Sequence, residues 1–589
     1  MSIRVLAGVL ALPSVALAAA ACGNESFPLD LNNKQAFGLR AARGAHSAAE
    51  CVRACCNATT ARCGAWQWWG QEATCFIGQP TKVRVTSDTS FSGGMVVPPS
   101  PAPTPPVPPA PTPPPTPPKL PSPDQLAWLD LEMGTFFHFT MYTFVSQPNP
   151  VTARHQDCGA VFNADLAAMP HPSVFNPSNA STMVDQWMAA SKAMGARYAI
   201  LVAKHCDGFI SFPTNATFAD GSPYGYGVQQ SSWRGGRGDL ARDFVESARK
   251  HGISPGFYYS LDSNFYLSVA DGKPTPATAA GQRPATTAEY YDVVLTQLAE
   301  LWGNYGQLGE IWFDGKNPFV QNSTLQAAVA ALAGRLQPHA LLMQGPSATN
   351  AGRKGDGETC EVNDPNWYTC PNSTACRSTL GGQGPFIPAE GAGCAVGDGD
   401  SRQWFWHPDH DEHAALKTVD MFVDEYHKSV GLGSNMLVGL TADRQGLVPD
   451  MDVAKISALG DFVRRCYGSP LAMTNGSHTL RGPSDHIDLA VPQGAEGRIH
   501  MDRVWLREDM RNYGQRAQEF QVFASEDGGA TFSRIGNGTS IARKRIVLLH
   551  SPIAIDILRF QVTKALEWPL VIQEAAAFKQ ALCCPPPGC

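Results

Sequence analysis

A proline run over residues 98–123 limits what this chain can fold into more than any other segment. Sixteen of its 26 residues are proline, a residue that lacks a backbone N–H and fixes φ near −65°. Such a segment favours an extended polyproline II conformation, which at about 3.1 Å per residue would reach roughly 80 Å. We therefore expect a stiff linker here that separates a small N-terminal part from a large C-terminal part.

Residues 22–97, ahead of the linker, contain six cysteines within a short stretch. Metal binding could use these thiols, but the spacing favours a small disulfide-rich module with a short helix followed by strands. Six cysteines allow 15 pairings, and the sequence does not choose among them. Three tryptophans in this module could stack on sugar rings or form one buried strand face: Trp66, Trp68 and Trp69.

The N-terminus and the cysteine content both indicate an oxidising compartment. Arg4 precedes an apolar run that ends in small residues near Ala20, so residues 1–21 are expected to be a signal peptide. The chain has 16 cysteines and eight N-x-S/T sequons, a combination typical of secreted or lysosome/vacuole-like luminal glycoproteins. No later apolar run is long enough to span a membrane. The net charge of −7 does not indicate the basic surface that nucleic-acid binding requires.

After the linker, residues 124–470 alternate strand-like and helix-like segments. This pattern predicts a (β/α)8-like, TIM-type barrel or a doubly wound parallel sheet. The expected strands are 135–140, 197–203, 256–261, 308–315, 341–345, 403–407 and 435–440, with a long Cys- and Gly-rich excursion at 346–400. The expected helices begin near residue 181 and otherwise cover 239–250, 286–302, 323–335, 412–429 and 450–465.

Residues 471–582 change to short alternating segments separated by turns. This pattern predicts an antiparallel β-sandwich. The tail, residues 583–589, adds three cysteines that could pair with one another or with the body of the protein. The chain as a whole is therefore expected to be a multidomain α/β protein.

Polar residues stand where several expected strands end, which is where such barrels place their active sites. Asp314 ends an apolar strand and could serve as nucleophile, base or metal ligand, although capping of the next helix is the alternative. His138 and the Lys204-His205 pair end two other strands. Glycoside hydrolysis needs a second carboxyl group, for which Glu358 and Glu390 in the excursion are the candidates.

Aromatic residues near these strand ends could form a floor for a sugar ring, and core packing is the alternative. They are Trp312, Trp404, Trp406 and His407. A zinc site at His407, His410 and His413 is disfavoured because the segment has the features of a loop leading into a helix. Phosphate-binding, dinucleotide and zincin motifs do not occur, so no metal and no cofactor are expected.

Taken together, these motifs resemble the α-L-fucosidases of glycoside hydrolase family 29. The resemblance covers about residues 124–580 and is carried by GTFFHFT, AKHCDGF, GFYYSL, IWFDG, QWFWHP and NMLVGLTADRQGLVPD. It implies a (β/α) barrel with a C-terminal β-sandwich, hydrolysis of α-fucosides with retention of configuration, and fucosylated oligosaccharides or glycoproteins as substrates. The Cys-rich module loosely resembles apple/PAN modules, which implies a glycan or protein ligand.

The resemblance also implies roles for particular residues. Asp314 matches the nucleophile, and His138 and His205 match histidines that bind fucose hydroxyls. Trp312 matches a wall of the pocket, and Tyr258 matches the tyrosine beside the nucleophile, with Tyr259 as the alternative by register.

A second group of matches concerns the branch of the family that acts on α-1,3/1,4-fucosides. Arg353 and Glu358 resemble its R-x-x-x-x-E arrangement, in which the glutamate is the acid/base. Glu390 resembles a contact on the aglycone side, and Trp406 an aromatic near the fucose methyl group.

This sequence departs from the family where the second histidine of K-H-H-D-G-F is replaced by Cys206. A thiol is a weak donor and cannot replace imidazole at a sugar hydroxyl. Three alternatives to a fucosidase therefore stay open. They are a fucose-binding lectin without turnover, a hydrolase of another terminal sugar such as galactose, and an adhesion protein that carries the enzyme domain as a passenger.

Overall fold

The structure is a computed structural model of the chain. It describes residues 29–95 apart from 33, 38, 43, 58–62, 64, 79–81 and 86–89, and then 120–145, 168–345 apart from 180, 181 and 316, 351–354, 388–394, 404–406, 408 and 417–583 apart from 496. The chain forms two compact units, Met1–Pro114 and Pro115–Cys589, and the boundary falls inside the proline run.

The described residues of the N-terminal unit form a five-stranded antiparallel sheet, one helix and a further strand pair. The sheet has the order β1-β7-β4-β5-β3, and β2 pairs with β6. The bounds are β1 (Leu29–Asp30), β2 (Lys34–Phe37), β3 (Arg40–Ala42), α1 (Ala48–Cys56), β4 (Ala65–Trp69), β5 (Thr74–Gly78), β6 (Lys82–Val85) and β7 (Phe91–Met95).

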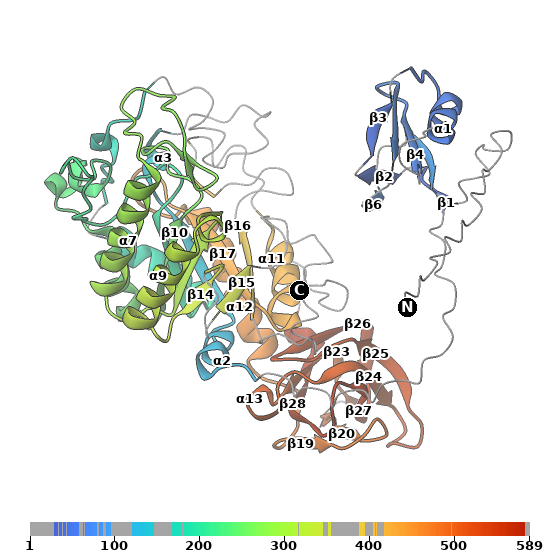
Figure 1. The fold of residues 1–589 in the computed structure, drawn as a ribbon. Coiled ribbons are helices and arrows are strands. Elements are labelled where there is room, and N and C mark those ends of the chain that lie inside the picture. The colour runs from blue at the N-terminus through green and yellow to red at the C-terminus, as the bar shows by residue number, and fades with distance from the viewer. Residues whose placement is uncertain are drawn as a thin grey trace, which may run out of the picture. The chain divides into compact units, whose positions relative to one another are not determined.

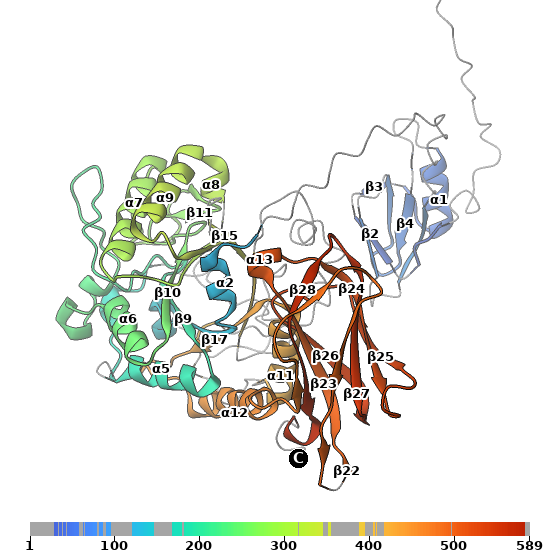
Figure 2. The same cartoon turned by 90° about the horizontal axis from the view of Figure 1, so that it is seen from below.

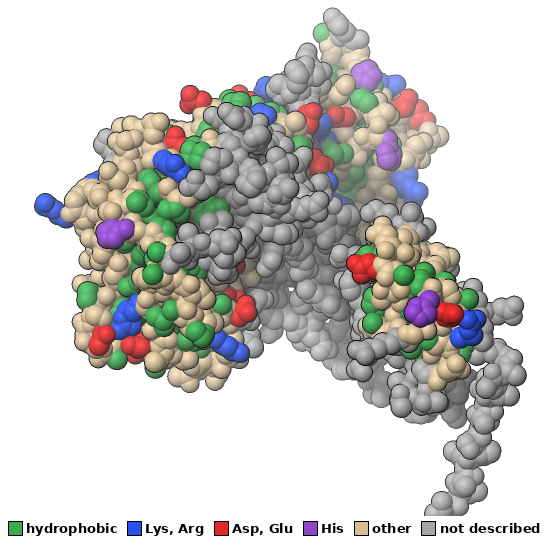
Figure 3. All heavy atoms as spheres, turned by 90° about the horizontal axis from the view of Figure 1, so that it is seen from above, with side chains coloured by type: hydrophobic (Ala, Val, Ile, Leu, Met, Phe, Trp, Pro, Cys, Tyr) green, Lys and Arg blue, Asp and Glu red, His purple; other side chains and the backbone are tan. Residues whose placement is uncertain are grey.

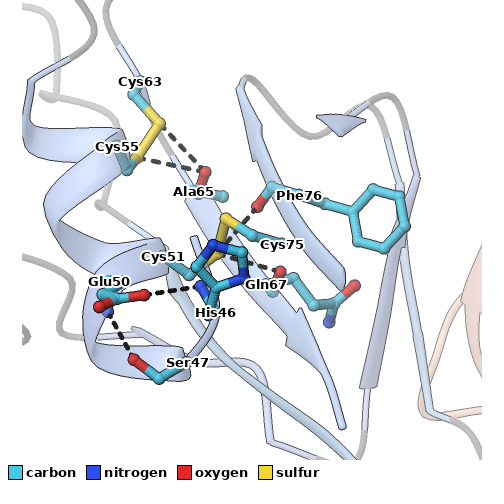
Figure 4. Close-up of a disulfide and its surroundings, with 10 residues drawn as sticks. All are labelled: His46, Ser47, Glu50, Cys51, Cys55, Cys63, Ala65, Gln67, Cys75 and Phe76. Atoms are coloured by element: carbon cyan, nitrogen blue, oxygen red, sulfur yellow. Dashed lines mark hydrogen bonds between the residues drawn. A yellow bond between two sulfur atoms is a disulfide. The ribbon is translucent and has the colours of Figure 1, made fainter. Parts of the chain in front are cut away.

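Two disulfides fasten helix α1, as the close-up in Figure 4 shows. Cys51 bonds to Cys75 on β5, and Cys55 bonds to Cys63 just before β4. The Ser47 hydroxyl accepts the Glu50 N–H and caps the helix. The prediction of a disulfide-bonded module with a helix and strands is therefore confirmed for these residues.

The second unit contains a closed barrel of parallel strands. Its strands pair in the order β8-β9-β10-β13-β14-β15-β16-β17, and β17 pairs back with β8. The bounds are β8 (Met133–His138), β9 (Tyr198–Lys204), β10 (Ser254–Ser260), β13 (Glu310–Asp314), β14 (Leu341–Met343), β15 (Ala351–Lys354), β16 (Ala389–Cys394) and β17 (Asn435–Thr441). Every residue of β8, β9 and β17 is buried, which explains why these segments are continuous apolar runs.

Helices lie outside the strands in Figures 1 and 2. Some of them begin at side-chain caps: Asp239 caps α6, and Thr286 forms a capping box with Glu289 at the start of α7. The bounds are α2 (Pro123–Leu129), α3 (Met141–Val145), α5 (Met183–Met194), α6 (Leu240–Lys250), α7 (Thr287–Gly303), α8 (Asn317–Gln321), α9 (Ser323–Leu336), α11 (Val419–Lys428) and α12 (Asp450–Tyr467). The loops add β11 (Val269–Ala270), β12 (Lys273–Pro274), η2 (Pro172–Val174), η3 (Val228–Gln230), η4 (Trp233–Gly236) and η6 (Val430–Leu432).

The sequence prediction is wrong for two of the barrel strands. Residues 404–406 of the strand expected at 403–407 form a bend, and β15 and β16 come instead from the segment interpreted as an excursion. The reason is compositional, because AGRK and AEGAGC lack the β-branched and aromatic residues that mark a strand. Only their pairing partners in the ring make them strands.

Residues 472–579 form antiparallel sheets, as predicted for this region. One sheet has the order β18-β28-β23-β26 with β19 also on β28, and the other has the order β20-β27-β24-β25. One apolar cluster draws residues from both sheets, Val504 and Phe560 among them. The bounds are β18 (Ala472–Met473), β19 (His478–Leu480), β20 (His486–Ala490), β21 (Gln493–Gly494), β22 (Gly497–Arg498), β23 (His500–Glu508), α13 (Met510–Tyr513), β24 (Ala517–Ser525), β25 (Ser533–Gly538), β26 (Arg545–Ala554), β27 (Ile557–Ala565), β28 (Leu570–Lys579) and η7 (Gln580–Leu582).

The start of the C-terminal tail is fastened to the barrel. Cys583 forms a disulfide with Cys466 of α12, 117 residues away in sequence. Of the two pairings considered for the tail cysteines, Cys583 therefore adopts the one with the body of the protein.

The surface and the helices add two observations. On the face in Figure 3, basic and acidic side chains of the described residues are interspersed rather than gathered by sign. Among the described residues, none of the helices has the length and apolar character needed to cross a membrane.

Candidate active site

Alternate residues of the barrel strands point inward and build the site in layers. On β13 the inward residues are Glu310, Trp312 and Asp314, because side chains on a strand alternate between its two faces. Phe136 and His138 on β8 follow the same period, and they lie beside Trp312 and Tyr258 of the interior cluster. His138 and Asp314 stand at the carboxyl ends of their strands, as the sequence predicted, whereas Glu310 stands at the amino end of β13.

Asp314 is held by a tyrosine of the neighbouring strand. The Tyr258 hydroxyl donates a hydrogen bond to Asp314 Oδ2 at 2.5 Å, and the Asp314 side chain is only partly buried. Gly315 then turns the chain with φ +84°, and a Cβ there would lie 1.9 Å from Cγ of Asp262. Only glycine fits this exit, which keeps the carboxylate at the end of the strand.

The structure also separates Tyr258 from Tyr259, which the sequence left as alternatives. Tyr258 faces the interior, whereas the Tyr259 hydroxyl donates to Gln297 of α7 at 2.6 Å, on the outer side of the strand. Tyr258 is thus the tyrosine beside Asp314.

His138 and His205 come together across the barrel mouth. Their ring centroids lie 5.7 Å apart, and His205 stacks on Tyr258 at 5.4 Å with an interplanar angle of 11°. Burial, with a smaller contribution from His205, lowers the pKa of His138 well below its usual value, so this ring is neutral. His138 Nδ1 is buried and has no hydrogen-bond partner among the described residues. A neutral imidazole with a free nitrogen can bind a sugar hydroxyl.

Two aromatic residues close the space over these histidines. Trp404 lies 4.9 Å from His138 between ring centroids, and Phe405 lies 5.3 Å from His138 and 5.1 Å from His205. Phe405 was not a sequence candidate, since its neighbours in QWFWH were read as a strand. Trp404 and Trp406 were both sequence candidates, and Trp406 lies under the Arg444 guanidinium at 5.6 Å.

The loop after β9 is held by two buried charged residues. Lys204 donates to the backbone carbonyls of Ser260 at 2.7 Å and Ser263 at 2.5 Å, and burial lowers its pKa to about 7. Asp207 accepts from the Thr140 hydroxyl at 2.6 Å, and burial raises the pKa of Asp207 to about 6. The sequence did not indicate that Lys204 and Asp207 hold the loop in place. Polar residues close to a histidine at a strand end are typical of an active site, and their hydrogen bonds to distant residues leave no local pattern in the sequence.

Cys206, in the same loop, is not a free thiol. It is disulfide-bonded. Its neighbours include Phe405 and Tyr142 in a small apolar cluster. The expectation of a weak thiol donor in place of the family's second histidine is therefore wrong, since a disulfide sulfur has no proton to donate.

Glu390 does not lie at the barrel mouth with His138, His205 and Asp314. Its side chain is 1% exposed, and it accepts hydrogen bonds from Tyr198 at 2.6 Å and from the Trp312 indole at 2.9 Å. Both Tyr198 and Asn435, the strand neighbour of Glu390, begin their strands. Glu390 is thus at the base of the barrel, away from the mouth where an aglycone would leave.

Three predicted residues stay untested by geometry, and the first of them, His407, lies outside the described residues. Glu358 lies outside the described residues, and Arg353 is described only as part of strand β15, paired with Ala389. Elsewhere in the described chain, no group of three or more His, Cys, Asp or Glu side chains is arranged to hold a metal ion.

Comparison with known proteins identifies the family. The family model of alpha-L-fucosidases matches residues 118–468. This chain belongs to the α-L-fucosidase family. The chain is 26% identical over 493 residues to Alpha-L-fucosidase 1 of Arabidopsis thaliana, which covers 77% of this chain and 86% of that relative.

Solved structures agree with this assignment to the fucosidases. A protein of Bacteroides thetaiotaomicron VPI-5482, provisionally assigned as an α-L-fucosidase, is 26% identical with a TM-score of 0.62, over 78% of this chain and 99% of that one. A family 29 fucosidase of Ruminococcus gnavus, solved in complex with fucose, has a TM-score of 0.58 at 18% identity, over 79% of this chain and 96% of that one. The second likeness concerns the fold alone.

Proposed function

We propose that this protein is a retaining exo-α-L-fucosidase that removes terminal fucose by double displacement. The observation that carries the proposal is the pairing of Asp314 with the Tyr258 hydroxyl, beneath a buried His138 whose Nδ1 has no partner among the described residues. A carboxylate held in one orientation can attack, and a neutral imidazole can bind a hydroxyl. Membership of the fucosidase family favours fucose hydrolysis over a lectin without turnover or a galactose hydrolase.

In the first step, Asp314 attacks the anomeric carbon and the glycosidic bond breaks. Glu358, in its acid form, gives its proton to the departing oxygen. In the second step, ionised Glu358 takes a proton from water, whose oxygen displaces Asp314 and releases fucose with its original configuration. Tyr258 holds the carboxylate in both steps, and His138, His205, Trp312 and Trp406 bind and enclose the sugar.

Several finer statements belong to the same proposal. Arg353, Glu358 and the family resemblance support the α-1,3/1,4-type branch. The closed ring of parallel strands supports a (β/α)8 fold, and the apolar cluster shared by the two C-terminal sheets supports a β-sandwich. The signal-like N-terminus and the disulfides support secretion or a lysosome/vacuole-like lumen. The Cys-rich module, with its partly buried Trp68 and Trp69, supports an apple/PAN-like accessory with a glycan or protein ligand.

The nucleophile is tested with Asp314→Ala and an aryl α-L-fucoside. The variant should lose turnover, and azide should restore it with formation of a fucosyl azide of inverted configuration, since azide then takes the place of the carboxylate. Full activity of Asp314→Ala would refute the assignment. Fucose release from α-1,2, α-1,3, α-1,4 and α-1,6 linked oligosaccharides then tests the branch, and inhibition by L-fucose against D-galactose tests the sugar.

A further inference from the structure

Two carboxyl groups lie together at the base of the barrel, where the mechanism does not use them. Glu310 begins β13 and Glu390 lies on β16, and each side chain is 1% exposed. The Trp128 indole of α2 donates to Glu310 Oε2 at 2.8 Å. These contacts join three segments that lie far apart in the sequence.

The hydrogen bonds define which atoms donate and which accept. The Trp312 indole N–H can only donate, so Glu390 Oε2 must accept it. The Tyr198 hydroxyl donates to Glu390 Oε1. Burial raises the pKa of both carboxyl groups, and the nearby Glu390 raises that of Glu310 further. Two buried carboxylates close together repel each other, so the pair favours a state with fewer than two charges.

Trp312 connects this pair to the site. Its indole ring stacks on Tyr258 with centroids 5.5 Å apart and an interplanar angle of 25°. Phe136 contacts the other aromatic side chains of this layer, with its centroid 5.7 Å from Trp312 and 4.5 Å from His138. The orientation of Trp312 therefore sets the surface on which Tyr258 rests, and the Tyr258 hydroxyl holds Asp314.

We propose that Glu390 is a positioning residue for the fucosidase site, which orients the Trp312 indole from below and through it Tyr258 and Asp314. This inference rests on the proposed function for its kinetic readout. The sequence suggested that Glu390 contacts the aglycone, and we assign it this positioning role instead. The buried carboxyl pair then contributes to the reaction indirectly, through Trp312.

The test compares two substitutions at Glu390. Glu390→Gln keeps an acceptor oxygen for the indole, and its kcat/KM on an aryl α-L-fucoside should stay within about threefold of the parent. Glu390→Met has a similar volume but no acceptor of this strength, so kcat/KM should fall at least tenfold, with KM raised. Partial misfolding would lower kcat and leave KM unchanged, so the rise in KM identifies misplacement of the pocket wall.

Tyr198→Phe is the matched control. It removes the other hydrogen bond to the same carboxylate, at the same depth, without touching Trp312. It should lower the melting temperature and leave kcat/KM within twofold. In a Trp312→Phe background, Glu390→Met should lower kcat/KM little further, because the indole N–H that Glu390 orients is already absent.

Two results would overturn the proposal: Glu390→Met with parental KM and kcat, or Tyr198→Phe with the same kinetic loss as Glu390→Met. The dissociation constant of L-fucose, measured by calorimetry, gives a readout that does not need turnover. If the parent protein binds L-fucose without hydrolysing the fucoside, the proposed function fails. Glu390→Met should then still weaken fucose binding at least tenfold, and unchanged binding would refute the positioning role separately.

Discussion

Tyr258→Phe should disable the enzyme without destabilising it. The substitution removes one hydroxyl, whose hydrogen bond to Asp314 measures 2.5 Å. A hydrogen bond to a charged group contributes about 1.5–3 kcal/mol, and each 1.36 kcal/mol changes a rate about tenfold. If the bond holds the carboxylate for attack, kcat/KM should fall by about 10- to 150-fold. Because Asp314 is only partly buried, water can replace the lost hydroxyl in the resting protein, so stability should change little.

The neighbouring residue supplies the control. Tyr259 is 1% exposed and Tyr258 is 2% exposed, but the Tyr259 hydroxyl donates to Gln297 in the layer between strand and helix. Tyr259→Phe leaves the Gln297 oxygen without its donor in a buried place, which costs about 1–3 kcal/mol of folding stability. This variant should therefore melt earlier and keep its kcat/KM.

The assay is release of the aryl group from an α-L-fucoside at a temperature well below both melting transitions, beside urea unfolding of all three proteins. The reasoning is refuted if Tyr258→Phe keeps kcat/KM within twofold of the parent. It is also refuted if Tyr259→Phe loses as much activity as Tyr258→Phe, since the effect would then belong to the strand rather than to the hydroxyl.

Three further predictions follow from the same structure. His138→Phe removes a buried ring nitrogen that has no hydrogen-bond partner among the described residues. The affinity for fucose should therefore fall at least tenfold, while the melting temperature stays the same. Calorimetry with L-fucose measures this, and unchanged affinity would contradict it. Cys466→Ser with Cys583→Ser opens a loop of 117 residues and should lower the free energy of unfolding by about 2–5 kcal/mol without changing kcat/KM, so an unchanged urea midpoint would contradict it. Burial raises the pKa of Asp207 from its usual 3.8 to about 6, so the folded protein holds a proton there that the unfolded chain loses, and stability should fall by about 2 kcal/mol between pH 4 and pH 6. Asp207→Asn should remove this pH-dependent loss, measured as unfolding midpoints across that range, and an unaltered slope would contradict it.

The strands that carry the site could be predicted because each is a buried parallel strand. Segments such as YAILVAK are apolar throughout, and a polar residue at the end of such a run stands out. That pattern alone led to His138, His205 and Asp314, and the structure brings these side chains to one end of the ring. The period of two along a strand explains why Trp312, a candidate for the aromatic floor, lies on the same face as Asp314.

What the sequence could not supply are contacts between residues far apart in the chain. The partners of Glu390 lie 192 and 78 residues away, and no local pattern marks them. A glutamate in a Gly- and Ala-rich segment has the appearance of a solvated loop residue until the strand around it is paired. The same limit applies to Cys206, whose chemistry depends on a sulfur elsewhere in the sequence.

The spacing along β13 explains why the base and the mouth of the barrel are linked through this strand. Glu310, Trp312 and Asp314 alternate on its inner face, so about 13 Å of strand carries a buried acid, the proposed pocket wall and the proposed nucleophile. Of these three side chains, Trp312 contacts both the base and the mouth of the barrel. Its indole N–H donates a hydrogen bond to Glu390 below, and its ring stacks on Tyr258 above. Phenylalanine at this position would keep the ring contact and lose the anchor, and leucine would lose both. A tryptophan at this position therefore combines the ring that forms the pocket wall with an N–H that fixes the angle of the ring. The hydrogen bond to Glu390 lies at the base of the barrel, where no sugar can reach.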